Sequence, residues 1–196
     1  ATSIENIIKG FDASRQLEMY RFFLVAFDAA PGVTYFNQLK QAVELGLSTR
    51  EIVNVFTTKQ QFLSAFPASL TSNEFATRLV DRVIGSLATA EAKVEAATQI
   101  VKALDEGLSR GDVIFTIFGN LAARETDPTK PGYLANDPYL AVARQLNNAV
   151  KVAEYYTEVL KGDSTNLLVL QTVVSRVTDT SDVSTPAALE SLSKVT

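Results

Sequence analysis

A proline-rich segment in the second half of the chain gathers the side chains best suited to binding chemistry. Residues 124–139 contain Pro128, Pro131, Gly132 and Pro138, a composition typical of a long loop. The nearby side chains able to stack on a sugar or hydrogen-bond to it are Tyr133, Asn136, Asp137, Tyr139, Arg144 and Tyr155. These residues are the best candidates for a glycan-binding surface, although the sequence favours the alternative in which the tyrosines pack the loop onto the helix that follows.

Acidic residues before and within this loop form a second candidate site. They are Asp105, Asp112, Asp127 and Asp137, which would meet around one calcium ion if the loop folds back. Calcium takes about six to eight oxygen ligands, and the EF-hand spacing is absent. Calcium is the one cofactor that these residues suggest. Asp112 has a simpler interpretation, because Ser109 three positions earlier gives it the spacing of a helix capping box.

Two residue types with distinctive chemistry are missing. The chain has no histidine and no cysteine, which excludes serine–histidine and cysteine–histidine nucleophiles, zinc fingers, thiol redox centres and iron–sulfur ligation. The remaining carboxylates, lysines and serines show no spacing typical of a catalytic site. We expect a protein that is not an enzyme.

The charge balance argues against two classes of partner. The chain has 18 basic and 22 acidic residues, for a net charge of −4, and no basic cluster. General nucleic-acid binding is therefore not expected. No apolar run approaches the roughly 18 residues of a spanning helix, so membrane insertion is not expected either.

Helix signals dominate the elements that must position these residues. Ser48-Thr-Arg-Glu51 and Thr71-Ser-Asn-Glu74 have capping-box spacing, as does Thr2-Ser-Ile-Glu5 ahead of a helix stop at Gly10. Apolar residues recur at helical spacing from Leu146 to Leu160, and no segment alternates as a strand does. The sequence predicts an all-α fold.

Two segments repeat at a distance of about 60 residues. Gly46-Leu-Ser-Thr-Arg-Glu51-Ile-Val matches Gly107-Leu-Ser-Arg-Gly-Asp112-Val-Ile, 61 positions later. The expected organisation is a compact multi-helix domain, 1–196, built from two degenerate repeat units and a C-terminal extension. Its parts are the units 12–66 and 72–123, the loop 124–139 and the C-terminal helices 140–196. Repeat units need neighbours to bury their apolar faces, which favours a single domain.

The residues that carry this repeat resemble a known family. Tyr20-Arg-x-x-Leu24, a turn at 28–32, an aromatic pair at Tyr35-Phe36 and the Gly46-Leu-Ser turn are similar to the helical repeat called the DUF4214 domain. Residues 147–156 and 177–184 also resemble segments of the N-terminal cell-anchoring region of bacterial surface-layer and RTX-type secreted proteins.

The resemblance implies a function at the cell surface. It implies a non-catalytic anchoring or assembly module, attached to lipopolysaccharide O-polysaccharide or to other copies of itself, with calcium helping assembly. The first residues do not read as a secretory signal, which fits type I export through a C-terminal signal beyond Thr196. The alternative is an intracellular helical adaptor or linker domain that binds protein partners.

The loop assignment makes a prediction for limited proteolysis. Exposed loops are cleaved before helices, so limited digestion with a protease of broad specificity is expected to cut near Lys130 before it cuts near Lys102 in the predicted second unit. The order of fragments by mass spectrometry measures this. Cleavage at Lys102 first would contradict the assignment of 124–139 as the most accessible segment.

Overall fold

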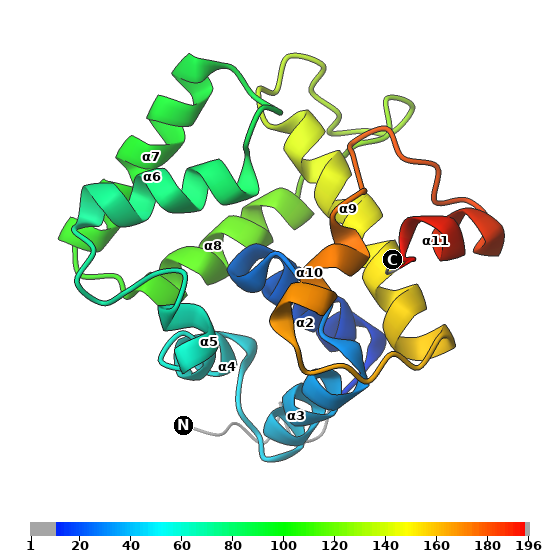
Figure 1. The fold of residues 1–196 in the computed structure, drawn as a ribbon. Coiled ribbons are helices and arrows are strands. Elements are labelled where there is room, and N and C mark those ends of the chain that lie inside the picture. The colour runs from blue at the N-terminus through cyan, green and yellow to red at the C-terminus, as the bar shows by residue number, and fades with distance from the viewer. Residues whose placement is uncertain (1–10, 195–196) are drawn as a thin grey trace.

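The computed structural model of the chain describes residues 11–194, which form helices and connecting loops without a β-strand (Figure 1). The predicted all-α class is confirmed. The capping box at Thr2–Glu5 and the stop at Gly10 lie outside the described residues. The elements are α2 (Ala13–Phe27), α3 (Gly32–Glu44), α4 (Thr49–Phe56), α5 (Gln60–Leu63), α6 (Ser72–Val83), α7 (Ala90–Asp105), α8 (Arg110–Ala122), α9 (Leu140–Glu154), the π-helix η1 (Tyr155–Val159), α10 (Leu167–Val174) and α11 (Pro186–Leu192).

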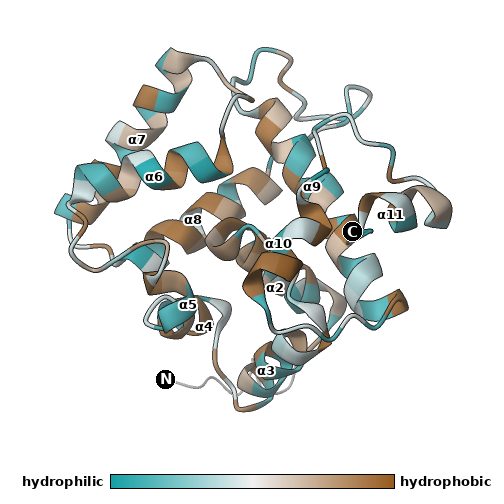
Figure 2. Ribbon diagram, in the orientation of Figure 1, coloured by the Kyte–Doolittle hydropathy of each residue, from teal (hydrophilic) through white to brown (hydrophobic). Residues whose placement is uncertain are grey.

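Helix α2 occupies the centre of the fold. Its residues 22–27 are six successive buried positions, whereas a surface helix buries only one stripe. Contacts with α4, α5, α8 and α9 cover it on several sides. Helix α10 lies against its C-terminal end, where the Gln171 side chain donates to the Phe27 carbonyl at 3.0 Å. Figure 2 shows α8 and α10 as largely hydrophobic, in keeping with this central packing.

The two repeat units share one order of elements. Helices α2, α3 and α4 of the first unit correspond to α6, α7 and α8 of the second, and the Gly-Leu-Ser turn precedes the third helix in both. Gly46 and Gly107 have φ angles of 90° and 104°, a backbone region that favours glycine. Ser48 and Ser109 then complete capping boxes with Glu51 and Asp112. The equivalent helices α4 and α8 pack against each other.

The C-terminal part differs from the prediction in one respect. The expected helix to Leu160 changes at Tyr155 from α-helix to the π-helix η1, while α9 begins at Leu140, where the predicted loop ends. After η1 the chain turns at Lys161, with φ 56°, and Gly162 lies against the Tyr156 ring so closely that a side chain would clash. Pro186 occupies the first turn of α11. Within residues 11–194 no helix combines the length and apolar character needed to cross a membrane.

The contact between the two units makes a prediction about two glycines of α8. A Cβ at Gly111 would lie 2.4 Å from Asn54 Oδ1 and 3.0 Å from Asn54 Cα, whereas a Cβ at Gly119 meets nothing within 4 Å. Overpacking costs about 1–3 kcal/mol, and Gly→Ala in a helix gains about 1 kcal/mol. Gly111→Ala is expected to lower the free energy of unfolding and Gly119→Ala to raise it slightly. Urea unfolding measures both, and equal stabilities would contradict the close α4–α8 contact.

Candidate functional site

The loop 124–139 is fixed to the helices on both sides of it. Arg124 Nε lies 2.7 Å from Asp137 Oδ2, and its guanidinium carbon lies 5.2 Å from the centre of the Tyr139 ring. The Tyr139 hydroxyl donates to the Ala92 carbonyl of α7 at 2.8 Å, and its backbone N–H donates to Asp137 Oδ1 at 2.9 Å. These contacts anchor the C-terminal end of the loop at the start of α9.

Arg144 anchors the other half of the loop from the second turn of α9. Its Nη2 donates to the Thr126 carbonyl at 3.2 Å and to the Tyr133 hydroxyl at 3.4 Å. Arg144 and Tyr133 remain half-buried, while Asn136 is exposed and Leu134 is 67% exposed. The loop therefore presents both apolar and polar groups, with one arginine and one phenol at its base.

The structure brings most of the predicted glycan-binding residues to one region. Tyr133 meets Arg144, Asp137 meets Tyr139 through its backbone, and Asn136 lies in the loop between them. Tyr155 does not join them, because it lies in η1, eleven residues after Arg144. At ~1.5 Å per helical residue this separates the two by about 16 Å along the helix. Tyr139 packs the loop against the helices, which is the alternative role that the sequence suggested for the tyrosines, because its hydroxyl donates to the Ala92 carbonyl of α7.

The four aspartates predicted as calcium ligands do not come together. Asp137 pairs with Arg124, and Asp127 accepts from the backbone N–H and hydroxyl of Thr129. Asp105 ends α7, while Asp112 caps α8. In the described part of the chain no group of three or more acidic side chains is placed to hold a metal ion. The physical reason is that three of these carboxylates already serve a helix cap, a turn or an ion pair.

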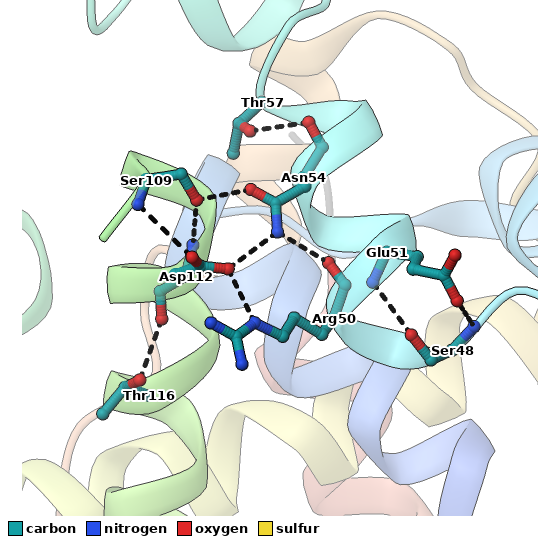
Figure 3. Close-up of polar contacts among 8 residues, drawn as sticks. All are labelled: Ser48, Arg50, Glu51, Asn54, Thr57, Ser109, Asp112 and Thr116. Carbon is teal, nitrogen blue, oxygen red and sulfur yellow. Dashed lines mark hydrogen bonds and ion pairs between the residues drawn. The ribbon is translucent and has the colours of Figure 1, made fainter. Parts of the chain in front are cut away.

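Asp112 is the centre of a polar cluster between α4 and α8 (Figure 3). Its Oδ1 accepts from Arg50 Nε at 2.7 Å and from Asn54 Nδ2 at 2.9 Å. Asn54 Oδ1 also accepts from the Ser109 hydroxyl at 2.6 Å. The Asn54 side-chain amide therefore contacts both residues of the α8 capping box. These donors, with Arg50 first, hold the pKa of the Asp112 carboxyl well below its ordinary value. The sequence predicted the cap but carried no signal for Arg50 or Asn54.

No family model, curated protein or solved structure matches this chain. The resemblance to surface-layer and RTX-type repeats accordingly stays a hypothesis that rests on sequence motifs. Function has to be argued from the residues themselves.

The polar cluster predicts a pH-dependent stability. Asp112→Ala removes the N3 carboxylate of the Ser109 capping box and an ion pair with Arg50, which is expected to lower the free energy of unfolding by about 1–2 kcal/mol at pH 7. The native pKa of Asp112 lies below its unfolded value of about 3.9, so its contribution is complete above that pH and declines as pH falls further.

The measurement is urea unfolding of both proteins between pH 7 and pH 3. The difference between wild type and Asp112→Ala is expected to be constant above about pH 5 and to shrink below about pH 4. Other carboxylates titrate in both proteins and cancel in the difference. A gap of the same size at pH 3 would contradict the ionised cluster in Figure 3.

Proposed function

We propose that this chain is a non-catalytic module that anchors a secreted bacterial surface protein to polysaccharide of the cell envelope, with lipopolysaccharide O-polysaccharide as the first candidate. The supporting observation is the arrangement of the loop 124–139 on α9. Tyr133 and Arg144 meet at its base, and Asn136 is exposed beside them. An extracellular, cell-surface location follows from this proposal, together with the resemblance of the sequence motifs.

The chemistry of the loop suits a sugar polymer. Within residues 11–194, Arg144 donates through Nη2 alone, which leaves the other guanidinium nitrogens to bind hydroxyl, carboxylate or phosphate oxygens of a glycan. The exposed Asn136 amide offers a donor and an acceptor, as sugar hydroxyls require. Half-buried Tyr133 supplies an aromatic ring of the kind that packs on a sugar face. Since the loop is already anchored at both ends, binding costs less ordering than it would in a free loop.

The second candidate is a module that binds protein, either other copies of itself or the partner of an intracellular adaptor. Large apolar side chains favour it, because Leu45, Leu134 and Leu168 are 75%, 67% and 73% exposed. These leucines belong to three different parts of the chain, and single exposed apolar residues are common on protein surfaces. We therefore rank it after the polysaccharide proposal.

Binding to lipopolysaccharide tests the proposal and locates the site. The chain is expected to bind smooth lipopolysaccharide, which carries O-polysaccharide, and to ignore rough lipopolysaccharide, which lacks it. Arg144→Ala and Tyr133→Ala are each expected to weaken binding at least tenfold. Tyr155→Ala is the matched control, because it removes a tyrosine at the start of η1, about 16 Å away, and should leave binding within twofold.

The readout is surface plasmon resonance with calcium and again with chelator, with circular dichroism melts to show that each variant folds. A loss of binding in chelator would support calcium at the interface with the glycan. Equal binding to smooth and rough lipopolysaccharide, or equal effects of all three variants, would contradict the proposed site. No binding at all would favour the protein-binding module.

A further inference from the structure

A separate cleft opens between the α6–α7 pair and helices α8 and α9. Its volume is about 260 Å³, and most of its wall is apolar. Leu79 and Val83 line it from α6, Ile100 from α7, Ile117 and Leu121 from α8, and Val142 from α9. Figure 1 shows α6 and α7 side by side above α8, which is where these walls meet. Ligand sites in proteins are typically apolar clefts of this kind with a few placed polar groups.

The cleft exists because the face of α7 that borders it carries short side chains. Ala96, Ile100 and Ala103 recur at positions i, i+4 and i+7 and so lie on one face of the helix, together with Gln99. Of the sixteen residues of α7, only Ala92 and Ile100 are buried. Leucine at 96 or 103 would reach across to α8, whereas alanine leaves the space open. The α4–α8 contact shows the opposite case, where Gly111 and Asn54 touch closely.

Polar groups gather at one end of the cleft. Asn120 and Arg124 come from the last turn of α8 and the residues after it, and Tyr139 closes the same end. Arg124 donates through Nε to Asp137 and through Nη1 to the Asn120 carbonyl. Among residues 11–194 its Nη2 has no acceptor. The ion pair with Asp137 cancels the charge of the guanidinium, so this end offers a hydrogen-bond donor without a net positive charge.

We propose that this cleft binds a single acyl chain of medium length whose head group is uncharged and accepts hydrogen bonds, as in a monoacylglycerol. An apolar cavity of about 150 Å³ holds one benzene ring, so 260 Å³ accommodates a longer flexible chain. The head group lies at Arg124 Nη2 and the Asn120 amide. An anionic head would face Asp137 beside the same guanidinium, which disfavours a fatty-acid carboxylate. The cleft shares Arg124 and Tyr139 with the loop 124–139, but neither Tyr133 nor Arg144 lines it, so this inference does not rest on the polysaccharide proposal.

The test is isothermal titration of the full chain with monolauroylglycerol below its micelle concentration. Saturable one-to-one binding is expected. Ala96→Leu and Ala103→Leu fill the cleft and should each weaken binding at least tenfold, while their melting temperatures stay equal to wild type or rise. Ala90→Leu makes the same change at an exposed position of α7 and should keep binding within twofold.

Two further measurements test whether the head group is uncharged and whether the acyl chain comes from a single-chain lipid or from a bilayer. Dodecanoate at pH 8 is expected to bind about tenfold more weakly than the ester, and equal or tighter binding would overturn the uncharged head. The chain is expected not to bind phosphatidylcholine vesicles. Vesicle binding that is lost in Ala96→Leu would overturn the proposal of a single-chain ligand. Absence of saturable binding, or binding that both filling variants leave unchanged while folded, would overturn the site itself.

Discussion

The burial of α2 is the constraint on which the rest of the structure depends. Six successive buried residues, from Phe22 to Phe27, leave no side of this segment for water. Burying one large apolar side chain stabilises the fold by about 1.5–3 kcal/mol, so exposing any side of α2 would be costly. The helix is therefore covered by α4 and α5 of its own unit, by α8 of the second unit and by α9 of the C-terminal part. Because helices from both repeat units and from the C-terminal part pack around α2, we infer that none of the three parts buries its apolar residues alone.

Arginines join the parts at the places where helices end and carbonyl groups lose their helical partners. Arg82 of α6 donates to the Ala26 carbonyl near the end of α2, at 2.8 Å. Arg110, at the start of α8, donates to the carbonyls of Pro67 and Leu70 in the connection between the two units, and stacks on Phe75. Arg50 joins α4 to α8 through a side chain instead, by an ion pair with the Asp112 carboxylate. The loop 124–139 is anchored by the same chemistry, through Arg124 and Arg144, and this is what allows it to serve as a binding surface.

Local signals in the sequence predicted the fold well and the candidate site in part. The Ser48 and Ser109 capping boxes and the Gly46 and Gly107 turns depend on residues close in the chain, so spacing alone was enough. The pairing of Asp112 with Arg50 depends on how α4 packs against α8, and the length of α9 places Tyr155 far from the loop. The cleft escaped prediction for a similar reason, since an alanine-rich helix gives no sign of whether its neighbours fill the space beside it.

Native-state hydrogen exchange, followed residue by residue, tests the central claim that one core holds all three parts together. The account predicts that the slowest amides of α2, α8 and α9 exchange through one global unfolding, with the same free energy of opening and the same dependence on denaturant. That result would establish 11–194 as a single cooperative domain, which the core residues from Met19 to Val177 suggest. Amides of α9 that open at a much lower free energy than those of α2 would contradict it.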